Sequence, residues 1–292
     1  MTRARLCFLL SSSLASLTAC SPRVLAERLL LRSHFEFTPD LPYAEGARRR
    51  LDVYRPRDGR RGAPVVVFLY GGRWQQGSKD QYRLLGDAFT RRGVVAVVPD
   101  YRVYPQVRFP AWVEDGAAAV RWTRDNIARF GGDPARIFLV GHSAGAHTAA
   151  LLALDRRYLT AAGVPNGTIR GAALLAGPVA TTWTDPDVQA LMGPREGWPA
   201  TYPLTYADGT GPPMLLLHGL RDRVVSPANS TRLAGRIRAR GGCARAITYR
   251  GLDHLGIVVA LSVPRFEIAP VLEDVLKFVG QPMEGCGTAS LP

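Results

Sequence analysis

The chain is poor in lysine and lacks long hydrophobic segments. Only Lys79 and Lys277 among its 37 basic residues are lysines. The arginine that produces the net charge of +13 is more consistent with GC-rich codon usage than with selection for phosphate binding. No basic run alternates with aromatic residues as in nucleic-acid-binding segments, so we expect no nucleic-acid partner. Beyond the first twenty residues, no segment is long and apolar enough to span a bilayer.

The first residues have the composition of a secretory signal peptide. Arg3 and Arg5 precede a short apolar and serine-rich run over residues 6–17, which ends in small residues. Residues 17–20 (Leu-Thr-Ala-Cys) also resemble a bacterial lipobox. We therefore predict a signal peptide over residues 1–19, acylation of Cys20, and a lipid anchor that holds the exported protein to a membrane of a bacterial cell envelope, on the periplasmic side. The alternative is an ordinary cleaved signal peptide followed by a chance cysteine.

Cysteine is scarce as well. Setting Cys7 and Cys20 aside leaves Cys243 and Cys286, and an exported location permits a disulfide between them. Such a bond would attach the C-terminal tail, residues 281–292, to the end of a predicted helix; the alternative is two unpaired thiols. Neither cysteine belongs to a C-x-x-C motif or lies near clustered histidines, so the sequence predicts neither a metal site nor a redox site.

Strands and helices alternate along the rest of the chain. Short apolar runs predict strands covered on both faces, and residues 51–54 alternate like an edge strand. This alternation predicts a doubly wound, mostly parallel α/β sheet flanked by helices, in one domain over residues 51–280 that follows an N-terminal segment over residues 20–50. Functional sites in such sheets lie at the carboxyl ends of the strands. The buried strands are predicted at residues 65–70, 94–98, 137–140, 171–176, 214–217 and 246–249, and the longer helices at 112–130, 144–154, 228–240 and 267–279.

Residues 177–212 interrupt the alternation. This segment is rich in proline and contains two tryptophans and two tyrosines, Trp183, Trp198, Tyr202 and Tyr206. We interpret it as a loop-rich insertion that covers the site and supplies aromatic pocket walls, because long irregular segments in compact domains are often functional. An ordinary surface excursion is the alternative.

Residues 141–145 read Gly-His-Ser-Ala-Gly, the G-x-S-x-G pattern that holds a nucleophilic serine on a sharp turn between a strand and a helix. A predicted strand precedes the motif, and a stretch rich in alanine and leucine follows it. The two glycines let the strand and the helix pack closely and allow a strained backbone between them. Ser143 is therefore the candidate nucleophile.

A serine hydroxyl needs a base that removes its proton, and the base needs a third group to orient it. His254 follows the last predicted strand and is the candidate base, whereas His218 ends a strand and is expected to shape the turn there. Asp222 follows the same strand as His218, and we assign it the role of orienting His254. Its alternative role is that of a turn or N-cap residue. Asp253 is next to His254 in sequence, and sequence neighbours cannot easily present side chains to each other's rings.

An acyl-transfer site also needs main-chain N–H donors for the oxyanion, each contributing roughly 3–4 kcal/mol to lowering the barrier. One donor is the residue after the nucleophile, here Ala144, and the others lie in the loop after an earlier strand. Residues 70–78 form that loop, and its glycines allow close approach of a substrate. We expect Gly72 and Arg73 to donate through their main-chain N–H groups.

These motifs together resemble the α/β-hydrolase superfamily. Within it, the chain is similar to the esterase branch that includes hormone-sensitive-lipase-like esterases, kynurenine formamidases and isoprenylcysteine methylesterases. The resemblance implies Ser143 as nucleophile, Asp222 as acid, His254 as base, and residues 71–73 with Ala144 as the oxyanion hole. The matching segments follow one another in a specific order: residues 51–56, 70–74, 100–102, 130–134, 141–145, the Asp222 turn and His254.

One segment departs from the family pattern. The family usually has His-Gly-Gly-Gly at the oxyanion loop, and this chain has Tyr70, Gly71, Gly72 and Arg73 there. A tyrosine can also form hydrogen bonds, and an arginine can still donate through its main chain provided that it needs no positive φ. Hydrolysis thus remains the expected activity, but the family's usual substrates are not carried over to this chain.

The sequence predicts a serine carboxylesterase that forms an acyl-enzyme on Ser143, acts on small-molecule esters, and needs no metal or organic cofactor. Two other functions stay open. One is amide cleavage of the arylformamidase or peptidase kind by the same three residues. The other is a non-catalytic binding protein built on a hydrolase scaffold.

Overall fold

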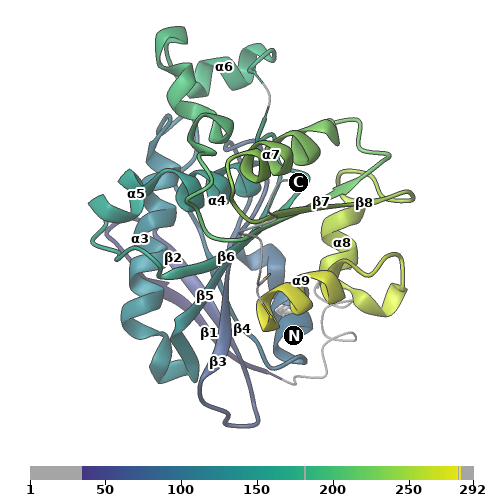
Figure 1. Ribbon diagram of the computed structural model, residues 1–292. Coiled ribbons are helices and arrows are strands. Elements are labelled where there is room, and N and C mark those ends of the chain that lie inside the picture. The colour runs from purple at the N-terminus through teal and green to yellow at the C-terminus, as the bar shows by residue number, and fades with distance from the viewer. Residues whose placement is uncertain (1–34, 181, 282, 284–292) are drawn as a thin grey trace, which may run out of the picture. The chain divides into compact units, whose positions relative to one another are not determined.

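The computed structural model describes residues 35–180, 182–281 and 283, and this part of the chain forms one sheet of eight strands (Figure 1). The strands lie in the order β1-β2-β4-β3-β5-β6-β7-β8. β2 is antiparallel to both of its neighbours, and all other neighbouring strands are parallel. The predicted fold class is therefore confirmed. The strands are β1 (Phe35–Pro42), β2 (Arg50–Pro56), β3 (Ala63–Leu69), β4 (Val95–Pro99), β5 (Gly132–His142), β6 (Ile169–Leu175), β7 (Met214–Gly219) and β8 (Ala244–Tyr249).

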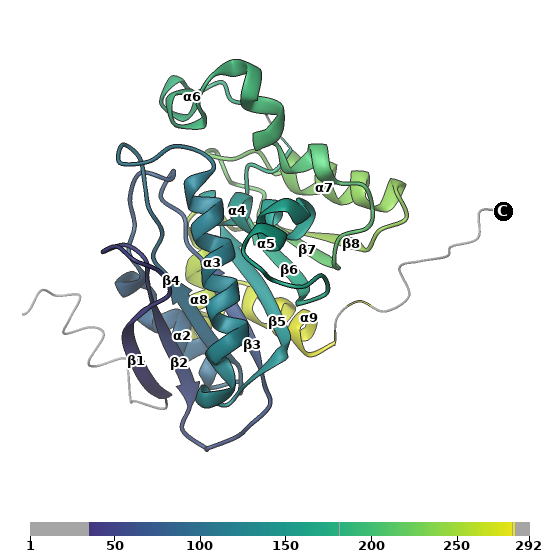
Figure 2. The same ribbon diagram turned by 90° about the vertical axis from the view of Figure 1, so that its left-hand side faces the viewer.

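Helices cover both faces of this sheet (Figures 1 and 2). α2, α8 and α9 lie on one face, and α3, α4 and α7 lie on the other. The α-helices of the described residues are α2 (Arg83–Thr90), α3 (Ala111–Asn126), α4 (Ala144–Leu154), α5 (Arg156–Ala161), α6 (Pro186–Met192), α7 (Ala228–Ala239), α8 (Gly256–Ser262) and α9 (Val271–Gly280). Short 3-10 helices are η1 (Lys79–Tyr82), η2 (Ile127–Phe130), η3 (Arg195–Thr201), η4 (Pro203–Tyr206) and η5 (Pro264–Phe266).

The central strands are apolar throughout because helices cover them on both sides. In β3, residues 65–69 are all completely buried. A strand with one solvated face would alternate apolar and polar residues, so the uninterrupted run in β3 follows from its central place. This packed sheet fixes the positions from which the loops at its carboxyl edge begin.

The sheet begins earlier than the predicted domain boundary. β1 pairs with β2, so residues 51–54 do not form an edge strand as predicted, and residue 51 is too late a start for the domain. The sequence pattern does not reveal β1 because its residues are mostly half-buried or exposed and its register shifts between Thr38 and Leu41. The predicted N-terminal segment therefore contributes a strand to the sheet.

Two helices follow the last strand where the sequence predicts one over residues 267–279. α8 was not predicted, and α9 begins at Val271. Glu267 has a φ of 49°, which ends the preceding turn, and Pro270 disfavours a helical conformation at the residue before it. A continuous helix therefore cannot start at residue 267.

Residues 177–212 follow the carboxyl end of β6 and carry α6, η3 and η4, so this segment, which we call the cover, is partly helical (Figure 1). The side chain of Asp185 accepts a hydrogen bond from the N–H of Asp187 and caps α6. Trp183 is 6% exposed, so the cover has a small apolar core that it shares with the rest of the domain.

Several sequence predictions lie outside the described residues: the signal peptide over residues 1–19, Cys20 and Cys286. Cys243 precedes β8 and is disulfide-bonded, and its pairing with Cys286 stays a prediction. Within the described ranges, no helix has the length and apolar character that crossing a membrane requires.

Candidate active site

Ser143 lies on a strained turn between β5 and α4. Its φ and ψ are 53° and −119°, a region that costs a non-glycine residue about 1–3 kcal/mol. The turn is held in place because Ser143 N–H donates to Leu175 O of the neighbouring strand β6 at 2.9 Å. The conformation turns the hydroxyl away from the strand and towards the carboxyl edge of the sheet, where the other candidate residues lie.

The glycines on either side of this turn are required by close main-chain contacts. A Cβ atom on Gly141 would lie 2.4 Å from Gly145 O, and one on Gly145 would lie 2.0 Å from Leu69 O. Real Cβ atoms do not approach oxygen so closely, so only glycine fits at either position. The G-x-S-x-G pattern thus reflects the packing of α4 against β3 and β5.

The structure brings together the three residues that the sequence singles out. His254 Nε2 lies 2.9 Å from Ser143 Oγ, and His254 Nδ1 lies 2.7 Å from Asp222 Oδ2. They come from the loops after β5, β7 and β8, whose carboxyl ends share one edge of the parallel sheet. An imidazole with this pair of contacts can receive a proton at Nε2 while the carboxylate binds the Nδ1–H.

The Asp222 carboxylate is buried and held by several donors. Its Oδ1 accepts hydrogen bonds from the main-chain N–H groups of Val224 and Val225, both at 2.8 Å. Burial by itself would raise the pKa of the Asp222 carboxyl, but the hydrogen bonds from Val225, His254 and Val224 outweigh it and lower this pKa below its ordinary value. Asp222 is therefore ionised at neutral pH.

Three further histidines lie near this edge and are buried. His147 Nε2 lies 2.7 Å from Thr201 O in the cover, and burial lowers the pKa of His147 to about 4. His142 Nε2 lies 2.9 Å from the main-chain oxygen of His254. His218, expected only to shape a turn, lies 3.2 Å from Asp222 Oδ2 through its Nε2. The four-residue spacing of His218 and Asp222 is the one sequence feature that could have indicated this contact.

Asp253 is not placed to orient His254. Its Oδ1 accepts a hydrogen bond from Gly256 N–H at 2.7 Å, so its side chain supports the start of α8. This is the arrangement expected for a carboxylate adjacent to the base in sequence.

The predicted oxyanion loop lies directly against the nucleophile. A Cβ atom on Gly71 would lie 3.0 Å from Ser143 Cβ. Gly72 has a φ of 130°, and a Cβ atom there would lie 2.1 Å from Gln76 O, so this position requires glycine. In the described part of the chain, the N–H groups of Gly72, Arg73 and Ala144 donate none of the main-chain hydrogen bonds of its loops and turns.

Arg73 adopts the left-handed conformation, with a φ of 56°, and Trp74 follows with 57°. The condition that the arginine need no positive φ is thus not met: the backbone keeps a glycine-like conformation although the glycine is replaced. Both side chains contact the cover. Arg73 Nη2 lies 2.7 Å from Asp185 Oδ2, and the Trp74 ring packs edge-on against Trp183 at 5.9 Å.

Tyr70 occupies the place of the family's usual histidine and is held by hydrogen bonds. Its hydroxyl donates to Asp100 Oδ1 at 2.6 Å, and its main-chain oxygen accepts from the Tyr101 hydroxyl at 2.8 Å. Burial raises the pKa of the Tyr70 phenol, with Tyr101 and Asp100 adding to the effect. Tyr70 therefore stays neutral and anchors the start of the predicted oxyanion loop.

The aromatic residues of the cover divide into two sets. Trp183 packs against His147 of α4 and against Tyr202, with ring centroids 5.4 Å and 5.8 Å apart. Trp198 donates to Gly193 O within the cover, and Tyr206 contacts Arg157 instead. Trp183 therefore packs into the domain, and an aromatic pocket wall supplied by the cover stays a prediction.

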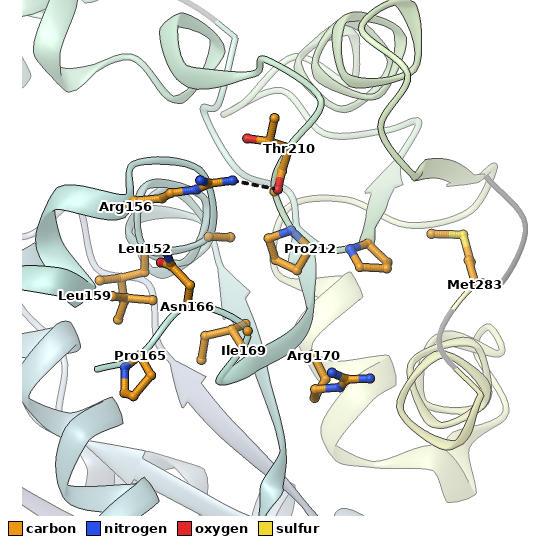
Figure 3. A pocket seen from close by; sticks show the side chains of 14 residues that line it. Leu152, Arg156, Leu159, Pro165, Asn166, Ile169, Arg170, Thr210, Pro212 and Met283 are labelled. Atoms are coloured by element: carbon orange, nitrogen blue, oxygen red, sulfur yellow. Dashed lines mark hydrogen bonds between the residues drawn. The ribbon is translucent and has the colours of Figure 1, made fainter. Parts of the chain in front are cut away.

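A cavity of about 500 Å³ lies elsewhere in the domain (Figure 3). It is formed around the beginnings of β6 and β7, at the sheet edge opposite Ser143, and none of the predicted site residues lines it. Arg156 Nη2 donates to Thr210 O across its rim. Among the described residues, no group of three or more histidine, cysteine, aspartate or glutamate side chains could hold a metal ion.

A mostly parallel sheet that carries a serine, an aspartate and a histidine in this chain order at its carboxyl edge defines an α/β-hydrolase. The model of the prolyl oligopeptidase family matches residues 112–285, and the model named BD-FAE matches residues 51–162. The chain belongs to the prolyl oligopeptidase family.

Several curated proteins are similar to parts of the chain. Esterase LipQ of Mycobacterium tuberculosis (strain ATCC 25618 / H37Rv) is 31% identical over 262 residues, which cover 82% of this chain and 62% of that protein. The probable isoprenylcysteine alpha-carbonyl methylesterase ICMEL1 of Oryza sativa subsp. japonica is 46% identical over 114 residues, which cover 39% of this chain and 27% of that protein. The chain thus spans less than two thirds of the length of these relatives.

Solved structures share the fold. A truncated form of a carbohydrate esterase from gut microbiota matches with a TM-score of 0.74 at 20% identity, covering 86% of this chain and 97% of that chain. The apo form of Thermogutta terrifontis esterase 2 matches with a TM-score of 0.69 at 24% identity, covering 86% and 97%. At these identities the similarity establishes the architecture alone.

Proposed function

We propose that the protein is a carboxylesterase that cleaves small-molecule esters through a covalent acyl-enzyme on Ser143. The observation that carries this proposal is the position of His254, whose two ring nitrogens lie 2.9 Å from Ser143 Oγ and 2.7 Å from Asp222 Oδ2. The esterase names of the relatives support the same reaction class.

In the proposed first half-reaction, Ser143 Oγ attacks the acyl carbonyl carbon and its proton moves to His254 Nε2. Asp222 stabilises the resulting imidazolium through the Nδ1–H. The negative oxygen of the tetrahedral intermediate is bound by the main-chain N–H groups of Ala144, Gly72 and Arg73, each lowering the barrier by roughly 3–4 kcal/mol. The C–O bond to the alcohol then breaks, and His254 returns the proton to the leaving oxygen.

The second half-reaction uses the same groups with water. His254 Nε2 takes a proton from a water molecule, whose oxygen attacks the acyl carbon. The bond to Ser143 Oγ breaks, the serine recovers its proton from His254, and the carboxylic acid leaves. Every proton is exchanged among Ser143, His254, the alcohol and water, so the proposed cycle needs no cofactor.

Amide cleavage by the same residues is the second candidate, and the match to the prolyl oligopeptidase family is the observation that favours it. The two functions are separated by measuring kcat/KM for an ester and its matched amide, including an N-formyl aromatic amine, on wild type and S143A. The proposal predicts that the ester is preferred and that S143A lowers its hydrolysis by several orders of magnitude. Preference for the amide would contradict ester cleavage as the main activity, and hydrolysis of neither by folded protein would favour a non-catalytic binding protein.

We also propose that the protein is exported and held at a bacterial membrane by a lipid on Cys20, on the strength of the apolar segment and lipobox-like residues 17–20. Mass spectrometry of the mature N-terminus from a membrane fraction tests this. An acylated Cys20 is the expected result, and an unmodified N-terminus would rule the anchor out.

A further inference from the structure

Two buried histidines outside the proposed catalytic set contact its members directly. His218 is the penultimate residue of β7 and is completely buried, and His142 is the last residue of β5 and is 4% exposed. One contacts the acid and the other the base. Both belong to parallel strands in the interior of the sheet.

The hydrogen-bond partners of His218 fix its tautomer. Its Nε2 lies 3.0 Å from Val225 O and 3.2 Å from Asp222 Oδ2, and both of these atoms are acceptors. Nε2 therefore carries the proton. Its Nδ1 lies 2.8 Å from Ser230 Oγ, so Nδ1 accepts and the Ser230 hydroxyl donates.

The Asp222 carboxylate consequently receives four donors. The N–H groups of Val224 and Val225 bind Oδ1, whereas the rings of His254 and His218 share Oδ2. A carboxylate held at both oxygens cannot rotate without breaking hydrogen bonds in a buried site, where unpaired polar groups are costly. His218 thus holds the oxygen that orients the base.

His142 provides the corresponding support for the base itself. His254 lies in the loop between β8 and α8, outside any helix or strand. The His142 Nε2–H donates to the main-chain oxygen of His254 at 2.9 Å, and the centroids of the two imidazole rings lie 5.0 Å apart. This bond ties the loop to the end of β5, one residue before the nucleophile.

Both supporting rings are neutral at neutral pH. Burial lowers the pKa of His142 to about 4, and the nearby His254 adds to the effect. Burial also lowers the pKa of His218, against the opposing influence of its Val225 and Asp222 contacts. Neither ring therefore places a second positive charge beside the imidazolium that forms on His254.

We propose that His218 and His142 are positioning residues of this site: His218 holds the Asp222 carboxylate, and His142 holds the main chain of His254. Together they keep the base in contact with both Asp222 and Ser143 while it gains and loses a proton. This inference rests on the proposed function, and it assigns to neither histidine any contact with the substrate.

The test compares variants that keep or remove the N–H donor at each position. H218L and H142L remove it, H218Q and H142Q can retain it, and S230A keeps the His218 ring and its Nε2–H but removes the hydroxyl that binds Nδ1. H147L is the control for loss of a buried imidazole in the NMR readout below, because His147 bonds to Thr201 O in the cover; its ring packs against Trp74 of the predicted oxyanion loop, so its kcat does not serve as a control.

We expect H218L and H142L to lower kcat for a short ester by about 10- to 100-fold while KM changes by less than about threefold. The glutamine variants should recover most of this loss, and S230A should fall between wild type and H218L. Equal kcat in wild type, H218L, H142L and S230A would overturn the proposal. If a leucine variant does not fold, S230A and the glutamine variants still decide the question, because S230A removes the hydrogen bond that holds the His218 ring at Nδ1 and leaves the rest of the site in place.

A proton NMR signal gives a readout that is independent of turnover. The Nδ1–H of His254, bound to Asp222, is expected as a low-field resonance in wild type. It should be broadened or lost in H218L and retained in H218Q and H147L, and its persistence in H218L would count against the inference. If wild type hydrolyses no ester, the proposed function fails, whereas the effect of H218L on this resonance still tests the positioning role.

Discussion

Arg73 Nη2 lies 2.7 Å from Asp185 Oδ2, so the loop proposed to bind the oxyanion is tied to the residue that caps α6 in the cover. The two side chains are 43% and 44% exposed. Solvent screens such a pair, and exposed ion pairs contribute little to stability. The conformation of the Arg73 main chain must therefore depend more on buried packing than on this contact.

Replacing Asp185 by asparagine tests this directly. Asparagine caps a helix as well as aspartate, so D185N removes the ion pair and keeps the start of α6. We expect kcat for a short ester to fall by less than about fivefold, with the difference from wild type shrinking as salt is added. D187N is the matched control, since Asp187 lies 4.0 Å from the same nitrogen and is 77% exposed. A loss of several orders of magnitude in D185N alone would show that the ion pair controls the loop.

The strained backbone at Ser143 predicts that two substitutions at this position differ in stability. Its φ of 53° and ψ of −119° suit glycine but not alanine. Both S143A and S143G should be inactive, but S143G should have the higher free energy of unfolding, by about 1 kcal/mol after allowance for glycine's greater freedom in the unfolded chain. Urea denaturation measures this difference, and equal stability of the two variants would mean that the strain relieved by glycine is no larger than its entropic cost of about 0.5–1 kcal/mol.

The contact between α4 and β3 predicts that Gly145 cannot be replaced. A Cβ atom would meet the main-chain oxygen of Leu69 at 2.0 Å, and neither backbone can move without disturbing the sheet. We expect G145A to lose about 3 kcal/mol of stability or more. Gly235 in α7 is the control: no atom lies within 4 Å of its Cβ position, so G235A should gain about 0.5–1 kcal/mol. Thermal unfolding of both variants measures these changes in stability, and a G145A variant as stable as wild type would contradict the close contact.

Two buried histidines make the fold sensitive to acid. Burial lowers the pKa values of His142 and His147 to about 4 in the folded protein, whereas an unfolded histidine titrates near pH 6.5. Between these pH values the unfolded chain binds more protons, so the free energy of unfolding should fall as the pH drops from about 6.5 to about 4. Each histidine contributes on the order of 3 kcal/mol to that fall.

Urea denaturation at pH 7.5, 5.5 and 4.5 measures the effect. The comparison that isolates it is the change in unfolding free energy with pH for wild type and for H147Q, because the substitution removes one titrating group whatever its effect on absolute stability. H147Q should show a smaller loss between pH 7.5 and 4.5. An identical pH dependence in both proteins would mean that folding leaves the pKa of His147 unchanged.

The parts of the fold visible in the sequence are those with strong local signals. Residues 65–69 are apolar without interruption because helices cover β3 on both sides, and such runs identify central strands. β1 could not be predicted in this way, because its half-exposed residues gain their strand conformation from pairing with β2. α8 escapes it as well, because seven residues are too few to show helical periodicity.

The chain order and the motifs were sufficient to predict the three central residues of the site. Ser143, Asp222 and His254 each follow a strand, and parallel strands bring such residues to one edge. The contact of His218 with Asp222 could not be foreseen, because it depends on how the loop after β7 folds back. The left-handed conformation of Arg73 likewise depends on the tertiary packing of Trp74 and the cover, which residue type alone does not encode.

The most direct test of the account is covalent labelling with a fluorophosphonate probe, followed by peptide mass spectrometry. The probe should modify wild-type protein at Ser143 and nowhere else, and folded S143A should remain unlabelled. H254Q should react far more slowly, because no base then takes the serine proton. Equal labelling of wild type and S143A, or no labelling of correctly folded wild type, would contradict the claim that Ser143 is an activated nucleophile.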